Sequence, residues 1–126
     1  MDISDCLDLG PVLIALAALK NGAILTGTDR LKIKESDRGQ VMHEELQKLG
    51  GGLIFGENTI TVPKLEFGNA KTVLDGHNDH RIVMAFSIGA AFAGKQSTVT
   101  DAEAINKSYP KFFEDLKQLG ADVNLI

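Results

Sequence analysis

Charged and polar residues gather in three short stretches of this sequence, each just before an apolar segment. The first stretch runs from Lys32 to Arg38 and packs two lysines, a glutamate and an arginine around Ser36 and Asp37. Lysine and arginine bind phosphate and carboxylate groups, and arginine can grip a carboxylate with two parallel hydrogen bonds. Glu35 among them could carry a proton. Spacing alone supports equally an anion site and a solvated loop in which Ser36 or Asp37 caps a helix.

The second stretch, Asp75 to Arg81, holds two histidines, two aspartates and an arginine. Histidine and aspartate are common metal ligands, so a metal site is one interpretation. Arg81 would repel a cation, however, and we expect no metal. The favoured interpretation is that Asp79 caps a helix while His80 and Arg81 face a bound anion.

The third stretch, Asn106 to Pro110, resembles a capped helix start with Lys107 in solvent. Near the beginning of the chain, Asp8 is the predicted N-cap of the first helix. Cys6 is the only cysteine, which excludes an internal disulfide, and we expect it to be an inert core residue.

Four apolar segments that follow helical spacing must position these stretches, and a glycine after each is expected to end it. We predict helices over 8–21, 37–49, 80–93 and 109–119, ended by Gly22, Gly50, Gly94 and Gly120. The expected buried face of the first is Leu9, Val12, Leu13, Leu16 and Leu19. A helix N-terminus exposes unpaired N–H groups and positive potential, so charged stretches there favour anion binding.

Short strands are predicted between the helices, which gives an α/β fold. The candidates are Ala23–Gly27, Gly52–Phe55, Thr59–Val62, Lys71–Leu74, Ser97–Thr100 and Asp122–Ile126, with a three-residue hairpin loop at Gly56–Asn58. The segments LQKLGGGLIF and LKQLGADVNL match in residue type and position. We therefore predict two related units, about 1–65 and 66–126.

Composition limits the classes of partner. The 126 residues carry a formal net charge of −4, with one tyrosine and no tryptophan, which disfavours nucleic-acid binding. No apolar run reaches the roughly 18 residues of a membrane span, and the first residues lack the zones of a signal peptide. We expect a cytoplasmic protein with no membrane partner.

Four motifs, in order along the chain, resemble one family. They are Asp5-Cys6-Leu7-Asp8-Leu9-Gly10-Pro11, Lys34-Glu35-Ser36-Asp37-Arg38, Asn78-Asp79-His80-Arg81-Ile82-Val83-Met84-Ala85, and Lys107-Ser108-Tyr109-Pro110 with Phe112-Phe113. Together they resemble the C-terminal third of the 3-phosphoshikimate 1-carboxyvinyltransferases, a family of enolpyruvyl transferases. The resemblance implies that residues 1–126 are part of a C-terminal domain, an inside-out α/β barrel, whose partner is an N-terminal domain of the same enzyme.

The resemblance also implies a reaction. The family transfers the enolpyruvyl group of phosphoenolpyruvate to the 5-hydroxyl of shikimate 3-phosphate and releases phosphate, without metal or organic cofactor. By motif, Asp8 would hold the shikimate hydroxyls and help to deprotonate the attacking one. Glu35 would deliver a proton to the methylene carbon and later remove one.

The same resemblance assigns the cations to substrate binding. Lys34 would lie against the phosphorylated shikimate, and Arg38 and Arg81 would clamp the phosphoenolpyruvate carboxylate. Lys107 would meet its phosphate, and His80 would hydrogen-bond within the same pocket.

Three other expectations remain open at this point. The chain alone should lack transferase activity, because the other domain also contributes residues that grip the substrates. A relative that transfers enolpyruvyl to a UDP-aminosugar, UDP-N-acetylglucosamine enolpyruvyl transferase, is an alternative. A non-catalytic anion-binding module is another.

Overall fold

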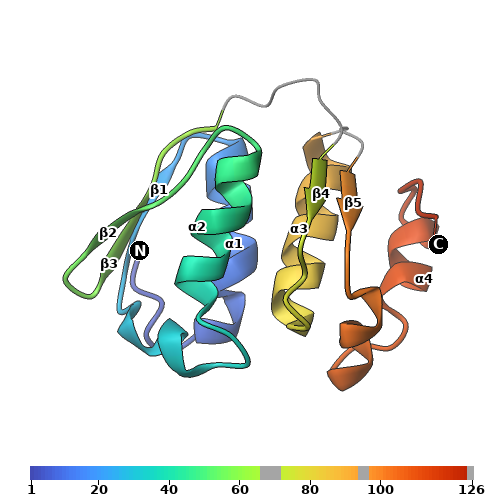
Figure 1. Cartoon of the computed structure of the whole chain (residues 1–126), viewed down its shortest axis with the longest axis horizontal. Coiled ribbons are helices and arrows are strands. Elements are labelled where there is room, and N and C mark those ends of the chain that lie inside the picture. The colour runs from blue at the N-terminus through green and yellow to red at the C-terminus, as the bar shows by residue number, and fades with distance from the viewer. Residues whose placement is uncertain (66–71, 94–96, 125–126) are drawn as a thin grey trace.

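The computed structural model describes residues 1–65, 72–93 and 97–124, which combine helices and short strands (Figure 1). The α-helices in these ranges are α1 (Gly10–Leu19), α2 (Arg38–Lys48), α3 (His80–Ala93) and α4 (Phe112–Gln118). The strands are β1 (Ala23–Thr26), β2 (Ile54–Gly56), β3 (Thr59–Val62), β4 (Thr72–Leu74) and β5 (Ser97–Val99). Three 3-10 helices join them: η1 (Leu7–Leu9), η2 (Asp29–Ile33) and η3 (Ala102–Lys107). The predicted α/β class is confirmed.

The strands form two small sheets. The first is antiparallel in the order β1-β3-β2, and the second pairs β4 with β5 in parallel. In the first sheet Leu25 lies opposite Ile60, and both are buried, whereas the neighbouring Ile24 is exposed. This alternation directs one face of the sheet toward the helices.

The hairpin between β2 and β3 is tighter than predicted. Gly56 belongs to β2 and pairs with Thr59, so the loop consists of Glu57 and Asn58 rather than three residues. Asn58 has a φ of 52°, in the left-handed region that asparagine tolerates better than most residues.

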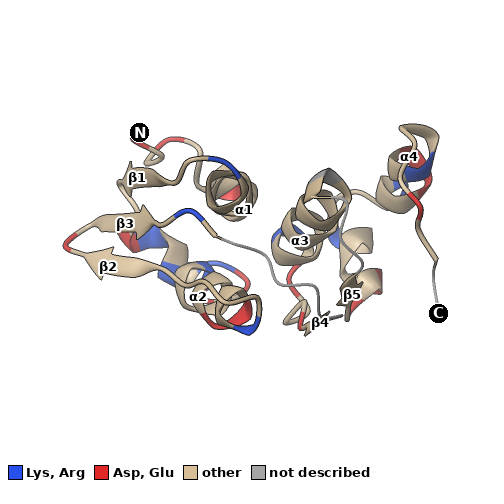
Figure 2. Cartoon of the chain, turned by 90° about the horizontal axis from the view of Figure 1, so that it is seen from above, with Lys and Arg blue, Asp and Glu red and all other residues tan. Residues whose placement is uncertain are grey.

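Helices α1, α2 and α3 begin at the same end of the molecule, at the bottom of Figure 1. Helix α1 packs mainly against α3, and α2 also contacts α1. Viewed from above, α1 and α2 lie beside the three-stranded sheet, and α3 lies between them and α4 (Figure 2). This arrangement brings three helix starts, and the charged residues before them, to one end.

The predictions for α2 and α3 are confirmed within one or two residues. Buried Val41, Met42 and Leu46 lie on the predicted face of α2. Helices α2 and α4 both end on a left-handed glycine, with φ of 93° at Gly50 and 103° at Gly120. Each end also has a backbone hydrogen bond from the residue after the glycine back to a leucine, the arrangement that closes a helix C-terminus.

The other two glycines predicted to end a helix are Gly22 and Gly94, and the structure describes only the first of them. Gly22, after α1, has a φ of 77° and donates its N–H to the carbonyl of Ala17. The predicted stop at Gly94 and the strand position Lys71 lie outside the described residues.

The first helix corrects two predictions. Asp8 is not its N-cap: Asp8 lies in η1, and Leu9 occupies the cap position without a side-chain hydrogen bond. The buried residues include Ile14, Ala15 and Ala18, whereas Leu9 is 49% exposed. The helix is apolar on every side, so hydrophobic spacing could not identify the buried face.

The last segments of the chain also differ from prediction. Helix α4 begins at Phe112 rather than at Tyr109, and Lys111 stands at its cap. Residues 121–124 are not in a strand, and residues 125–126 lie outside the described part. A strand forms only beside a hydrogen-bonding neighbour, and none accompanies these four residues in the described structure.

One large apolar cluster forms the core between α1, α2, α3 and the first sheet, and partly buried Cys6 packs against it. A smaller cluster of Val83, Met84, Ala104, Ile105 and Phe112 attaches η3 and α4 to α3. Among the described residues, no helix combines the length and apolarity needed to cross a membrane.

Candidate functional site

The guanidinium of Arg38, fully buried, is the centre of a polar cluster at the shared end of the helices. Its Nε and Nη2 donate to the two carboxylate oxygens of Asp79 at 3.0 and 3.2 Å. Nη1 donates to Asp8 at 3.0 Å, and Nη2 also donates to Glu35. One cation therefore joins three carboxylates that precede α1, α2 and α3.

Local capping fixes where these groups lie. The side chain of Asp37 accepts a hydrogen bond from the Gln40 amide at 3.2 Å, which starts α2 at Arg38 and confirms Asp37 as a cap. Asp79 accepts one from the Arg81 amide at 3.0 Å, as predicted for the start of α3. Ser36 does not cap the helix but donates to Asp79 at 2.7 Å.

The Arg38–Asp79 pair is stabilised electrostatically in a buried setting. Burial by itself would raise the pKa of Asp79, but the hydrogen bonds from Arg38 and Ser36 outweigh it and lower that pKa. Burial likewise opposes the charge of Arg38, but Asp79, Asp8 and Glu35 raise the pKa of its guanidinium above the usual value. Both groups are therefore charged near neutral pH.

Asp8 lies at the exposed side of the cluster, with three cations around it. Besides its hydrogen bond from Arg38, it lies 3.7 Å from Arg81 Nη2 and 4.0 Å from Lys34 Nζ. The Arg38 hydrogen bond, and then the charges of Arg81 and Lys34, hold the pKa of Asp8 below its usual value. Its side chain is 57% exposed, so a ligand could reach it.

His80 connects the cluster to the third charged stretch. Its Nδ1 lies within hydrogen-bonding distance of Ser108 Oγ, and its Nε2 is 3.8 Å from Glu35. Lys107 donates to the backbone carbonyl of Asn78, two residues before His80. The structure therefore joins six of the predicted site residues through side-chain contacts: Asp8, Lys34, Glu35, Arg38, His80 and Arg81. Lys107 is attached to this group only through the backbone of Asn78.

The two arginines of this group differ in how readily they could bind an anion. Arg81 Nε is buried and has no hydrogen-bond partner among the described residues. The carboxylates of Asp8 and Glu35, both about half exposed, already occupy Arg38. An anion that binds Arg38 directly would have to displace one of them.

A metal ion fits this geometry less well. Ligand atoms of Glu35, Asp79 and His80 lie within 4.8 Å of one another, close enough for one ion. The guanidinium of Arg38, however, already donates to both carboxylates. A metal ion would have to displace or oppose that positive charge.

Three contacts were beyond sequence analysis. Asp79 was expected only as a cap, although it is also the bidentate partner of Arg38, and the roles of Ser36 and Ser108 were missed. These contacts join residues from different stretches, and periodicity and capping rules describe only local sequence. Their place inside the four family motifs was the one signal that could have indicated them.

Fold and cluster together define a class: an α/β protein with a charged site built at the N-terminal ends of packed helices. The family model for EPSP synthase (3-phosphoshikimate 1-carboxyvinyltransferase) matches residues 1–116. The chain is 41% identical to the 3-phosphoshikimate 1-carboxyvinyltransferase of Clostridium acetobutylicum and 35% identical to that of Clostridioides difficile. Each alignment covers 98% of this chain and 29% of the relative.

Solved structures agree with the sequence matches. An EPSP synthase from Acinetobacter baumannii superposes with a TM-score of 0.74 at 30% identity, over 94% of this chain and 28% of that one. The chain therefore belongs to the EPSP synthase family, and it spans about 29% of the length of the curated relatives it matches.

Proposed function

We propose that this chain is a part of a 3-phosphoshikimate 1-carboxyvinyltransferase and holds half of its active site. The enzyme would transfer the enolpyruvyl group of phosphoenolpyruvate to the 5-hydroxyl of shikimate 3-phosphate and release phosphate, in the route to aromatic amino acids. The observation that carries this proposal is the connected cluster of Asp8, Glu35, Arg38 and Arg81 in a chain of this family.

Two carboxylates with solvent access suit the proton transfers of this reaction. In the addition step, Asp8 accepts the proton of the attacking 5-hydroxyl, and the oxygen of that hydroxyl bonds to the central carbon of phosphoenolpyruvate. Glu35 gives a proton to the methylene carbon, which becomes a methyl group in a tetrahedral adduct. In the elimination step the carbon–oxygen bond to phosphate breaks, and the leaving phosphate receives the proton that Asp8 had accepted. Glu35 takes a proton from the methyl group to restore the double bond, so both carboxyl groups return to their starting state.

The cations would offset the charge of two polyanionic substrates. Arg38 and Arg81 bind the phosphoenolpyruvate carboxylate, Lys107 its phosphate, and Lys34 lies against the shikimate. His80, close to Glu35, hydrogen-bonds in the same pocket. Before substrate arrives, carboxylates of the cluster hold Arg38, Arg81 and Lys34 in place, and the substrate anions then take over part of that pairing. No metal or organic cofactor is needed in this scheme.

The wider organisation is part of the proposal. Residues 1–126 would belong to the C-terminal domain, with related units over about 1–65 and 66–126. The recurring order of helix, strand, 3-10 helix and helix supports this division, as does the shared helix ending at Gly50 and Gly120. An N-terminal domain would close over the substrates, and the enzyme would work in the cytoplasm without nucleic acid.

An NMR titration of the chain tests the proposal. Phosphoenolpyruvate and shikimate 3-phosphate should shift the signals of Arg38, Arg81 and Lys107 and leave those of the exposed Arg30 unchanged. A UDP-aminosugar that shifts the same signals more strongly would favour the related transferase. Equal responses to inorganic phosphate and to phosphoenolpyruvate would favour a simple anion-binding module. If none of these ligands shifted the signals of the cluster, the result would contradict the proposed transferase, the related transferase and the anion-binding module alike.

A further inference from the structure

A second buried carboxylate, that of Glu45, lies on α2 outside the polar cluster. Its side chain is 3% exposed. Its Oε1 accepts hydrogen bonds from the Asp75 backbone N–H at 2.5 Å and from Lys48 Nζ at 2.6 Å, and its Oε2 lies 3.5 Å from His77 Nε2. Burying a carboxylate is costly unless its oxygens are hydrogen-bonded or paired with a cation, and Oε1 of Glu45 has both kinds of partner here.

Glu45 and Arg38 hold the two ends of one segment. They are seven residues apart on α2, which is about two turns, so they share a face of the helix. Arg38 binds Asp79, and Glu45 binds the amide of Asp75. The segment between these contacts leads directly into His80 and Arg81, both of which belong to the cluster.

This segment is a turn whose backbone takes an uncommon conformation. His77 and Asn78 have φ values of 52° and 51°, in the left-handed region that histidine and asparagine adopt more readily than most residues, and the hydrogen bonds of both amides go to side chains. On the opposite side, Thr100 and Asp101 accept hydrogen bonds from the amides of Gly76 and Asn78 at 3.1 and 2.8 Å. The segment is therefore held between α2 and the residues after β5.

We propose that Glu45 is a positioning residue for the anion site. By accepting the Asp75 amide, it fixes the turn that places Asp79, His80 and Arg81, although it touches none of them. This inference rests on the proposed function in that the anion is taken to be phosphoenolpyruvate.

Glu45→Met tests it, because methionine keeps the side-chain volume and helix preference but offers no strong acceptor. We expect the amide signals of Asp79, His80 and Arg81 to shift and phosphoenolpyruvate to bind about tenfold more weakly. Glu45→Gln keeps an oxygen for the Asp75 amide, so it should restore binding to within about threefold. Such a rescue distinguishes hydrogen-bonded positioning from a requirement for the charge.

Two controls accompany these variants. Glu44→Gln changes an exposed neighbour on α2 whose side chain accepts a hydrogen bond from Gln40. It should change neither the amide signals of residues 79–81 nor the affinity for phosphoenolpyruvate. Val62→Ala weakens the core in the first sheet, at a residue 1% exposed, and should lower stability without changing affinity. If Glu45→Met does not fold, Glu45→Asp replaces it, since the shorter carboxylate draws back from Asp75.

A folded Glu45→Met or Glu45→Asp chain with wild-type amide signals and affinity would overturn the inference. So would failure of both variants to fold, which would make Glu45 a purely structural residue. If the wild-type chain does not bind phosphoenolpyruvate, the proposed function is in doubt. The inference about Glu45 is then decided by the amide signals of residues 79–81.

Discussion

At the scale of single residues, the pairing of Arg38 with Asp79 explains why a guanidinium can be fully buried. The Nε, Nη1 and Nη2 atoms of Arg38 all donate to carboxylate oxygens, and the Asp79 carboxylate is further bound by Ser36 and by the Arg81 amide. Such a pair contributes less through its own attraction than through the penalty that follows when one partner is lost.

Arg38→Met should therefore lower the free energy of unfolding by about 3–5 kcal/mol, because it leaves the Asp79 charge buried without its main partner. Adding Asp79→Asn to this variant should restore part of the loss, since the remaining group is then neutral. Urea denaturation followed by circular dichroism measures both. Arg30→Met, at an exposed arginine of η2, is the control and should change stability by less than about 0.5 kcal/mol.

The same pairs predict how stability depends on pH. The pKa values of Asp79 and Asp8 are lower in the folded chain than the value near 3.9 expected when unfolded. The unfolded chain thus binds more protons, so this stabilisation is complete above about pH 5 and is lost as pH falls below about 4 toward the folded pKa values. The urea concentration at the unfolding midpoint, measured from pH 7 to pH 3, should decrease as the pH drops through that window, and it should decrease less steeply in Asp79→Asn. A midpoint that increased on acidification would contradict the assignment.

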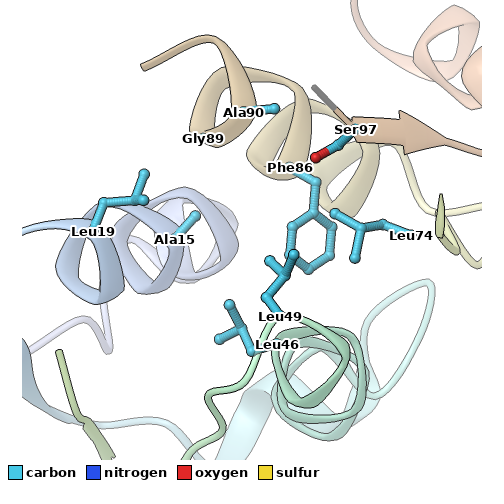
Figure 3. A pocket seen from close by; sticks show the side chains of 9 residues that line it. All are labelled: Ala15, Leu19, Leu46, Leu49, Leu74, Phe86, Gly89, Ala90 and Ser97. Carbon is cyan, nitrogen blue, oxygen red and sulfur yellow. The ribbon is translucent and has the colours of Figure 1, made fainter. Parts of the chain in front are cut away.

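At the scale of elements, small residues allow α1 and α3 to pack closely. Gly89 on α3 faces Ala15 and Leu19 on α1, beside an apolar pocket (Figure 3). Leu46 of α2 and Leu49, the residue after that helix, also line this pocket. The residues that line this pocket are not those of the charged cluster. This contact can therefore be changed without touching the site.

Gly89→Ala should stabilise the chain by about 1 kcal/mol, because alanine is the better helix former. Its added Cβ would lie 3.7 Å from Ala15 Cβ and from Leu19 Cδ1, an ordinary contact. Thermal and urea unfolding measure the gain. Gly76→Ala is the contrasting control, since its Cβ would come within 2.4 Å of the Thr100 carbonyl oxygen and should destabilise the chain.

At the scale of the whole molecule, the charged cluster lies at one end and is open to solvent on the side of Asp8 and Glu35. The chain covers about 29% of the length of its relatives. Groups from elsewhere in such an enzyme would be needed to exclude water and strengthen the electrostatic interactions at the cluster.

The chain alone should accordingly show no measurable release of phosphate from phosphoenolpyruvate and shikimate 3-phosphate. A steady-state phosphate assay on the pure chain tests this, with a full-length relative such as the Clostridium acetobutylicum enzyme as the positive control. Turnover close to that of the full-length enzyme would refute the expectation.

The sequence alone determined part of the local structure of this protein, because caps, glycine stops and hydrophobic spacing act between neighbouring residues. They predicted α2, α3, β3, the cap at Asp79 and a cap at either Ser36 or Asp37, which proved to be Asp37. Four motifs in order were also enough to indicate the family.

Only the tertiary structure decided what the charged residues contact. Asp8 met Arg38 instead of capping α1, and the buried face of that helix was set by its contact with α3. Glu45 lies between Val41, Met42 and Leu46 on the predicted buried face of α2, but its partner, the Asp75 amide, is 30 residues away and only the packed structure shows it. Charges and strands find partners far along the chain, and the packing of the helices determines which partners come within reach.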